Sequence, residues 1–375
     1  MAVNLRIVHC FRSPVGGIFR HVRDLTEAQV AAGHAVGIVC DSTTGGDYEE
    51  RLFDAMKDSL ALGIHRTPMQ RHVGPGDLAS AWRTYRIIQE LRPDVLHGHG
   101  AKGGAYARLF GSLLRVSRFR VARLYSPHGG SLHYDETTAT GKLFFGLERF
   151  MARFTDCLLF VSDYERKTYR RKVGEPPIPN RLVYNGLRAA EFESVTTADA
   201  ADFLYIGMMR DLKGPDIFID ALALAGNELG RPLSAVMVGD GDDLPRYHAQ
   251  VERLGLESHV RFLPPMPARD AFALAELIVV PSRAEAMPYI VLEALAAGMP
   301  MIATAVGGIP EIFGENSPAL IRPDAFQLAA KMGTALGDFD GYRKLMPQAD
   351  ELKARFGADV MAADIEKAYF AALHK

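Results

Sequence analysis

The sequence lacks several features that would place it in a membrane, secreted or metal-binding class. No apolar run reaches the roughly 18 residues that a membrane-spanning helix needs. Three cysteines are scattered over 375 residues, so neither a disulfide framework nor a cysteine metal site is expected. The start, MAVNLRIVHC, has no basic segment followed by a long apolar core, so no secretory signal is expected. Together these absences predict a cytoplasmic protein.

The composition indicates a globular chain that is long enough for two domains. Hydrophobic residues make up 48% and charged residues 23% of the sequence, which are the proportions of ordinary globular proteins. No low-complexity tract or short internal repeat is present. A chain of 375 residues predicts two domains of usual size.

The net charge of −2 hides a difference between the two halves. Residues 1–180 carry 25 Lys and Arg against 18 Asp and Glu, while the remainder carries 18 against 27. A basic first half favours an anionic partner, such as a phospholipid surface, and hence peripheral attachment to the inner face of a membrane. Solvated surface charge is the alternative interpretation. The candidate lipid contacts are Arg115, Arg118, Arg120 and Arg123, and separately Arg166, Lys167, Arg170, Arg171 and Lys172.

Strand-like apolar runs recur between amphipathic stretches along the whole chain. This pattern of repeated βα units predicts parallel sheets covered by helices on both faces. Twelve strands are too many for one compact sheet of this length, so two doubly wound, Rossmann-like α/β domains are expected. The boundary is expected in the proline-rich segment 174–180 or just after it, near 186–200. The expected strands are 5–10, 34–40, 94–99, 121–126, 156–162, 181–185, 203–207, 234–239, 260–264, 276–282, 300–305 and 319–323.

The expected fold also predicts where a ligand binds. Ligands of parallel α/β sheets bind outside the carboxyl ends of the strands, so two such domains facing each other create a deep cleft between them. Helix N-termini line such a cleft, and they favour anions.

The stretch GMMRDLKGPD (207–216) follows a strand and opens a helix at about Pro215. It brings Arg210 and Lys213 to the expected cleft, where two cations and a glycine loop suit a diphosphate. A solvated loop is the alternative.

Two glycine turns also follow strands. Gly16 and Gly17 would let backbone come close to phosphates or a bound sugar, although Gly-Gly often marks only a tight turn. The turn VGGIPEI (306–312) either brings backbone to the cleft or only reverses the chain. The turn with Gly16 and Gly17 lacks the G-x-G-x-x-G spacing of a dinucleotide site, which weighs against a dehydrogenase.

Histidines gather at the ends of strands. We expect His97 and His99 to point to opposite faces of their strand, and since no third ligand is evident nearby, no metal site is predicted there. His128 precedes Gly129 and Gly130, which would place its imidazole over the floor of the cleft. A substrate contact is favoured for His128 over a packed structural role.

Asp240 and Asp242 resemble an Asp-x-Asp metal motif for a nucleotide sugar. The surrounding VGDGDDL, however, reads as a turn from a strand into a helix. We therefore expect Asp242 or Asp243 to cap that helix rather than to bind a metal.

The segment PSRAEAMPYIVLEALAAGMP (281–300) places two carboxylates around the start of a helix. Pro288 suits a first helical position and Gly298 a position just past the end. Glu285 then lies on the loop before the helix, and Glu293 lies over a turn inside it.

The longer stretch SRAEAMPYIVLEALAAGMPMIATAVGGIPEI resembles the signature of the retaining glycosyltransferase family 4 of GT-B fold, the glycosyl transferases group 1. In that family Glu-x7-Glu is followed by a helix of small residues, Gly-x-Pro, and a Gly-Gly-x-x-Glu turn. The resemblance extends over nearly the whole chain. Supporting matches are Gly16, Gly17, Gly33, His34, His99, His128, Ser162, Asn185, Gly186, Lys213, Gly214 and 238–241.

The resemblance implies retaining, metal-independent transfer of a sugar from a UDP- or GDP-sugar, with no cofactor. It implies an acceptor-side domain of residues 1–186 plus a closing helix of about 358–375 that crosses back to it, and a donor-binding domain of residues 187–357. The acceptor would be a glycan or lipid-linked precursor in envelope polysaccharide or exopolysaccharide synthesis, and no nucleic acid is expected. The implied contacts are Glu293 with the donor ribose, Glu285 with the transferred sugar, Arg210 and Lys213 with the diphosphate, and His128 with the sugar near the reacting carbon.

The helix N-terminus near Met287, Pro288 and Tyr289 would then face the diphosphate. Two departures from the family pattern occur at this site. The loop after the first glutamate commonly reads Gly-Phe-Gly, whereas here Pro288 removes one backbone donor. Met208 occupies the usual place of the phosphate arginine, so Arg210 would substitute from two positions on.

Two alternatives stay open: a nucleotide-sugar epimerase of the same fold, and a non-catalytic subunit that binds nucleotide sugar. The sequence leaves the base, the sugar, the acceptor, the linkage and the oligomeric state open.

Overall fold

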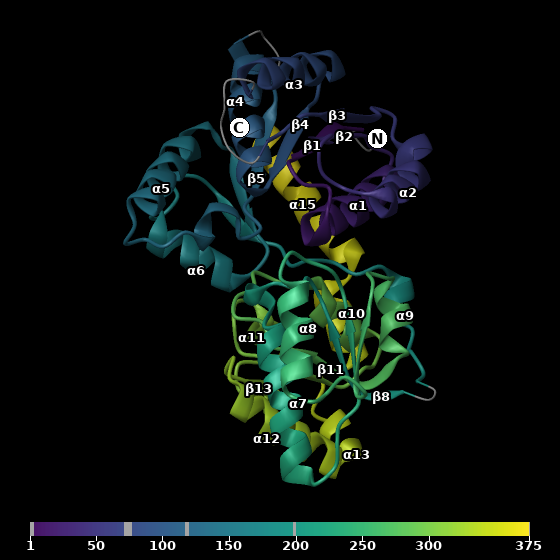
Figure 1. The fold of residues 1–375 in the computed structure, drawn as a ribbon. Coiled ribbons are helices and arrows are strands. Elements are labelled where there is room, and N and C mark those ends of the chain that lie inside the picture. The colour runs from purple at the N-terminus through teal and green to yellow at the C-terminus, as the bar shows by residue number, and fades with distance from the viewer. Residues whose placement is uncertain (1–3, 71–76, 117–119, 198–199, 375) are drawn as a thin grey trace. The chain divides into compact units, whose positions relative to one another are not determined.

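The protein folds into two compact units, each built on one parallel sheet (Figure 1). The computed structural model describes residues 4–70, 77–116, 120–197 and 200–374. The first unit comprises Met1–Gly186 and Ala358–Lys375, and the second comprises Leu187–Gly357. The two sheets, covered by helices, confirm the expected doubly wound α/β fold.

The sheet of the first unit has the strand order β3-β2-β1-β4-β5-β6-β7 among the described residues, and all its pairs are parallel. Because the order reverses between β1 and β4, a ligand is expected outside the carboxyl ends of these two strands. The edge strand β3 was not predicted, since its residues IHRT contain no apolar run. The strands are β1 (Arg6–Phe11), β2 (Ala35–Asp41), β3 (Ile64–Thr67), β4 (Val95–His99), β5 (Ala122–Ser126), β6 (Cys157–Phe160) and β7 (Asn180–Leu182).

Helices of the first unit include one from the far end of the sequence, α15 (Ala358–Leu373). Its apolar stripe, with Met361, Ile365 and Tyr369, packs in one core with Ile7 and Leu124 of the sheet, and the yellow helix lies among the purple and blue elements in Figure 1. The prediction that the closing helix crosses back to the first unit is therefore confirmed. The other helices are α1 (Gly16–Ala31), α2 (Asp47–Met56), α3 (Asp77–Leu91), α4 (Gly100–Val116), α5 (Ala139–Met151) and α6 (Asp163–Lys172), with short 3-10 turns η1 (Lys57–Ser59), η2 (Gly130–His133) and η3 (Ala152–Phe154).

The sheet of the second unit has the order β10-β9-β8-β11-β12-β13 among the described residues, again parallel throughout. Its switch point lies between β8 and β11. The strands are β8 (Ala201–Ile206), β9 (Ala235–Val238), β10 (Val260–Leu263), β11 (Ala275–Val280), β12 (Met301–Thr304) and β13 (Leu320–Ile321). The helices are α7 (Pro215–Leu229), α8 (Leu244–Arg253), α9 (Ala268–Phe272), α10 (Tyr289–Ala296), α11 (Ile309–Phe313), α12 (Ala325–Gly337), α13 (Phe339–Arg343) and α14 (Ala349–Phe356), with 3-10 turns η4 (Ala189–Phe192) and η5 (Asp211–Lys213).

Two expected helix starts differ in detail. Pro288 is the N-cap of α10 and not its first residue, because its backbone is extended, with ψ at 124°. Asp243 is the N-cap of α8 as expected, but its side chain makes no capping hydrogen bond. In contrast, α7 begins as predicted at Pro215, directly after the left-handed Gly214. Along the described stretches of chain, no helix combines the length and the apolar character needed to cross a membrane.

Candidate functional site

The loops after β8 and β11 bring Lys213 and Glu285 together at the switch point of the second sheet. The Lys213 Nζ atom donates to Glu285 Oε1 at 2.6 Å, and Ser282 Oγ donates to the same oxygen at 2.7 Å. The side chain of Glu285 is 8% exposed and that of Lys213 is 28% exposed, so the cation is the member of the pair nearer to solvent. The sequence predicted a ligand-binding role for each residue but not their mutual ion pair.

Glycines let neighbouring loops come into backbone contact at this edge. Gly307 has φ of 61°, and a Cβ atom there would lie 1.8 Å from the carbonyl oxygen of Glu285. The next residue, Gly308, donates its N–H to the carbonyl of Ala286 at 3.0 Å. The VGG turn after β12 therefore packs its backbone against the loop that carries Glu285.

Two arginines at this edge have different surroundings. Arg283, in the loop after β11, links that loop to the loop after β8 and to the start of α7. Its guanidinium donates to the carbonyl of Asp211 at 2.6 Å and to the carboxylate of Asp216. It was not among the predicted site residues. Arg210 is exposed, and within the described parts of the chain its guanidinium makes no hydrogen bond or ion pair. It begins the turn that ends at Lys213, whose N–H donates to the Arg210 carbonyl at 2.9 Å.

The helix α10 begins beside the same loop. Met287, Pro288 and Tyr289 are buried, and Glu293 is half-buried in the second turn. The start of the helix has no side-chain cap, and the positive end of the helix dipole lies there. A carboxylate before the helix and another one turn inside it thus flank the helix start, as the sequence predicted.

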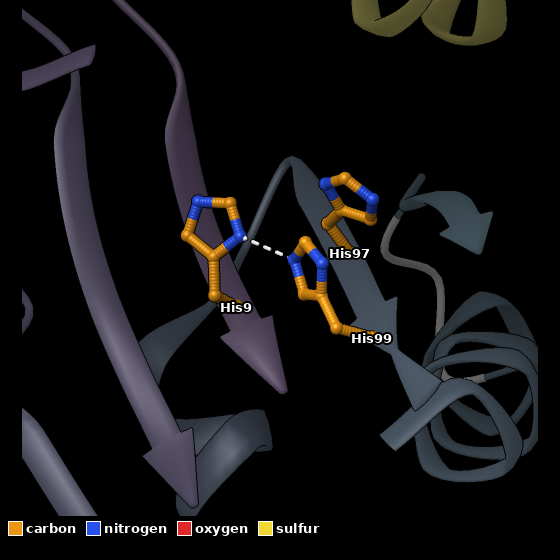
Figure 2. A group of neighbouring side chains, drawn as sticks. All are labelled: His9, His97 and His99. Carbon is orange, nitrogen blue, oxygen red and sulfur yellow. Dashed lines mark hydrogen bonds between the residues drawn. The ribbon is translucent and has the colours of Figure 1, made fainter. Parts of the chain in front are cut away.

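The first unit holds a separate cluster of histidines at the carboxyl ends of β1, β4 and β5. His97 and His99 project from the same side of β4 toward His9 on the adjacent strand β1 (Figure 2). The expectation that they point to opposite faces was wrong, because side chains two residues apart in a strand share a face. His9 was missed because strand pairing, rather than sequence proximity, brings it there.

Hydrogen bonds join the histidine rings in a chain. His9 Nδ1 lies 3.0 Å from His99 Nε2, and His99 Nδ1 lies 3.1 Å from His128 Nε2. Burial lowers the pKa of His9 to about 4, and burial with neighbouring histidines holds the pKa of His99 and of His128 well below its ordinary value. The rings are therefore neutral at pH 7.

The cluster also has the composition of a metal site. One ring nitrogen from each of His9, His97 and His99 lies within 4.8 Å of the others, and a second such group is His21, His99 and His128. However, both ring nitrogens of His9, His97 and His99 already have hydrogen-bond partners in the protein. The first group is thus fully hydrogen-bonded without an ion.

The turn that carries His128 is held by a buried carboxylate. His128 has φ of 50°, in the left-handed region that non-glycine residues seldom occupy. Glu165 on α6 accepts from the N–H of Gly129 at 2.5 Å and from the N–H of Val161 at 3.0 Å. Sequence reasoning missed Glu165, because Ser162 and Glu165 signal only a helix start, whereas Gly129 lies 36 positions away.

The start of α1 lies at the carboxyl end of β1, in the same unit. Gly16 and Gly17 are its first two residues and both are exposed. Gly16 has φ of 66°, and a Cβ atom there would meet nothing within 4 Å. The turn is therefore open on its outer side. Further along α1, His21 Nδ1 donates to Asn185 Oδ1 at 3.0 Å.

Comparison with known proteins identifies the family. Residues 16–186 match the glycosyl transferase 4-like domain, and residues 200–338 match the glycosyl transferases group 1. A D-inositol 3-phosphate glycosyltransferase from Thermobispora bispora is 32% identical over 370 residues, covering 90% of this chain and 81% of that protein. The chain belongs to the group 1 glycosyltransferase family.

Other relatives match over shorter or more distant ranges. The D-inositol 3-phosphate glycosyltransferase of Nocardia farcinica is 32% identical over 180 residues, so the match spans 45% of this chain and 40% of that protein. The structure of Anabaena HepE in complex with UDP-glucose has a TM-score of 0.80 at 18% identity, covering 97% of this chain and 99% of that one. Sucrose-phosphate synthase from Thermosynechococcus elongatus has a TM-score of 0.75 at 21% identity, with 98% and 99% covered. These likenesses show the GT-B fold.

Within this group 1 glycosyltransferase the two family matches separate the two candidate sites. The match over residues 16–186 contains His97, His99 and His128 of the histidine cluster but not His9, and the match over residues 200–338 contains Lys213 and Glu285. Each cluster lies at the ligand-binding edge of its own sheet.

Proposed function

We propose that this chain is a retaining, metal-independent glycosyltransferase that uses a UDP- or GDP-sugar and acts on a glycan or lipid-linked acceptor in envelope polysaccharide or exopolysaccharide synthesis. In that reaction the bond between the anomeric carbon and the diphosphate oxygen breaks. The acceptor oxygen bonds to the same carbon, and the acceptor proton passes to the leaving diphosphate. The observation that carries the proposal is the pairing of Lys213 with Glu285 at the switch point of the second sheet.

The chemistry of this pair fits the two ends of a sugar diphosphate. An ammonium group can neutralise the charge that develops on the leaving diphosphate, and Arg210 is exposed beside it. A carboxylate only accepts hydrogen bonds at pH 7, so Glu285 and Glu293 suit sugar and ribose hydroxyls. The full set proposed to contact the donor is Gly16, Gly17, His128, Arg210, Lys213, Glu285, Met287, Pro288, Tyr289 and Glu293.

We propose that Asp240 and Asp242 belong to the turn before α8 and bind no metal. Both are exposed, and Asp240 Oδ1 accepts from the N–H of Gly241 at 2.7 Å. Among the residues that the structure describes, no group of three histidine, cysteine or carboxylate ligands includes either aspartate. Turnover is expected to survive EDTA, whereas a loss that Mn²⁺ restores would support the metal interpretation.

The proposal is tested first by ligand binding and then by products. A ligand that binds only the native state raises the melting temperature, so UDP, GDP, ADP and their sugars are compared by thermal shift, with a UDP-sugar expected to give the largest rise. Radiolabelled donor is then supplied with lipid-linked glycan or with inositol 3-phosphate. Transfer to the lipid-linked glycan with the donor's anomeric configuration supports the proposal, whereas transfer only to inositol 3-phosphate would contradict the proposed acceptor. A released epimer would support an epimerase, and binding without product would support a non-catalytic subunit.

Helix α5 offers a surface for a lipid-linked acceptor. Leu143, Leu147 and Phe150 are 70%, 51% and 49% exposed and recur at helical spacing on one stripe. Lys142 and Arg149 on the same helix are exposed cations. An exposed apolar stripe beside cations is typical of a helix that lies at the surface of an anionic membrane.

The cations predicted from the sequence fit this role less well. Arg115 and Arg123 both bind Asp156, and Arg123 is buried. Arg118 lies outside the described residues, and Arg120 is exposed. The second group is also engaged: Arg166 and Lys167 pair with Asp163, Arg170 with Glu175, Arg171 with Glu136, and Lys172 donates to two backbone carbonyls.

Sedimentation with anionic and neutral vesicles tests the membrane surface. Binding to anionic vesicles should fall at high ionic strength and fall further in Phe150→Ser. Phe326→Ser is the matched control, since Phe326 on α12 is 71% exposed. Equal binding to neutral vesicles, or equal losses in both variants, would contradict a role for α5.

A further inference from the structure

A continuous run of hydrogen bonds leads from two helices of the first unit to His128. The Gln29 amide nitrogen on α1 donates to the Tyr369 hydroxyl on α15 at 3.2 Å, so the amide oxygen faces His9 Nε2 at 2.8 Å. An amide oxygen can only accept. His9 Nε2 must therefore carry the ring proton.

The remaining proton positions follow from one another. A neutral imidazole carries a single N–H, so His9 Nδ1 is bare and accepts from His99 Nε2–H across 3.0 Å. His99 Nδ1 is then bare and accepts from His128 Nε2–H across 3.1 Å. The last nitrogen, His128 Nδ1, is left without a proton. It makes no hydrogen bond to any other residue in the described parts of the chain.

We propose that Gln29, His9 and His99 are positioning residues that hold His128 as the Nε2–H tautomer. The ring then presents Nδ1 as a hydrogen-bond acceptor, which selects a substrate group that donates, such as a sugar or acceptor hydroxyl. A group that can only accept, such as a carboxylate, is disfavoured at this position. That His128 meets a substrate at all rests on the proposed function.

The direction of the whole run depends on the orientation of one amide. If the Gln29 amide were reversed, every bond would reverse and His128 Nδ1 would become a donor. A second branch is compatible with the orientation seen here and would reverse together with the amide, so the NMR spectrum distinguishes the two orientations. The Tyr369 hydroxyl accepts from Gln29, donates to His97 Nδ1 at 2.8 Å, and His97 Nε2 then donates to Ser126 Oγ at 2.9 Å. With the amide oriented as in the structure, every donor in the two branches meets an acceptor.

The test is NMR of the full-length protein with ¹⁵N-labelled histidine rings. A protonated ring nitrogen and a bare one resonate in well-separated regions, and His128→Gln identifies the His128 signals by their loss. The expected spectrum at pH 7 has His9, His99 and His128 all protonated at Nε2. A proton on His128 Nδ1 would overturn the proposal. So would a stoichiometric zinc or cobalt ion in the purified protein, because a metal would occupy the lone pairs that the run requires.

Two variants distinguish an effect of the hydrogen-bond run on His128 from a general effect on packing. Gln29→Met keeps the bulk but removes the amide, so His128 should become a mixture of tautomers and kcat/KM should fall by roughly fivefold, the loss of about one neutral hydrogen bond. Ser126→Ala alters only the other branch and should leave the His128 tautomer unchanged. Mixed tautomers in both variants, or in neither, would overturn the proposal. If Gln29→Met does not fold, the parental spectrum alone decides. Absence of turnover with every donor would defeat the proposed function, while the spectrum would still decide the tautomer.

Discussion

At the scale of single residues, the most informative contact is the ion pair between Lys213 and Glu285. The same ammonium group that is proposed to hold a diphosphate is bound by a carboxylate in the free protein. A diphosphate must therefore compete with Glu285 for Lys213. This competition leads to opposite expectations for the two partners.

Removing the cation should weaken diphosphate binding specifically. Lys213→Ala loses a charge-assisted contact worth about 1.5–3 kcal/mol, so the Kd for UDP should rise by roughly tenfold to a hundredfold while the Kd for uridine changes little. Isothermal titration calorimetry with both ligands measures the ratio, with the exposed Lys344→Ala as the control. Equal losses for UDP and uridine would place Lys213 away from the phosphates.

Neutralising the carboxylate should have the reverse effect on binding. In Glu285→Gln the lysine is released from its anionic partner, so UDP is expected to bind about twofold to fivefold more tightly, as for a partly exposed ion pair. Turnover should nevertheless fall, because the acceptor for a sugar hydroxyl is weakened. Weaker UDP binding would show that Glu285 holds Lys213 in place for the ligand rather than competing with it.

Gly307 should tolerate a side chain poorly. In Gly307→Ala the new methyl group would lie 1.8 Å from the Glu285 carbonyl, so the loop must move and both melting temperature and turnover should fall. Gly230→Ala is a matched control, since Gly230 has nearly the same backbone angle, φ 65°, but open space around it. The Gly230→Ala control is expected to lower the free energy of unfolding by about 1 kcal/mol, from backbone strain alone. Equal losses of melting temperature and turnover in the two variants would mean that the contact of Gly307 with the Glu285 loop is unimportant.

At the scale of elements, α15 is a structural part of the first unit. Ile365 is 1% exposed, so Ile365→Ala should lower the free energy of unfolding by about 2–5 kcal/mol. Lys367→Ala on the exposed face of the same helix should change it by less than about 0.5 kcal/mol. Thermal denaturation compares the two variants. Similar melting temperatures would show that the apolar stripe of α15 does not complete the core.

The elements also show what the sequence could predict. The family resemblance implied α15, and the spacing of Met361, Ile365 and Tyr369 carries its buried face, because helical periodicity is a local signal. The edge strand β3 had no such signal. His9 and Glu165 could not be found from spacing, since each reaches its site through contacts made across the sheet or between distant loops. The glutamates around α10 lay where their motif predicted, whereas the pairing of Glu285 with Lys213 required the strand order.

At the scale of the whole molecule, the buried histidines should make stability depend on pH. Burial lowers the pKa of His9 and of His21 from 6.5 to about 4. Below pH 6.5 the unfolded chain therefore binds protons that the folded protein does not, so stability is complete above that pH and is lost as the pH falls. Each of the two histidines should contribute a loss of roughly 2 kcal/mol between pH 7 and pH 5.

Melting temperatures measured across this range check the expectation. The change of melting temperature with pH should be smaller in His9→Gln, which removes one of the buried bases. It should be unchanged in His374→Gln, because His374 is exposed near the end of the chain. A melting temperature that stays constant from pH 7 to pH 5 would contradict the neutral, buried state of the cluster.

The placement of α15 has a consequence for the order of events during synthesis on the ribosome. Domains generally fold from the N-terminus as the chain emerges. Here the second unit is a single uninterrupted segment, Leu187–Gly357, whereas the first unit needs Ala358–Lys375 to be complete. The half that is made first must therefore wait for α15 to emerge, and Tyr369 joins the histidine cluster only then. A nascent chain stalled before α15 would expose the apolar surface that this helix covers and would be a substrate for chaperones.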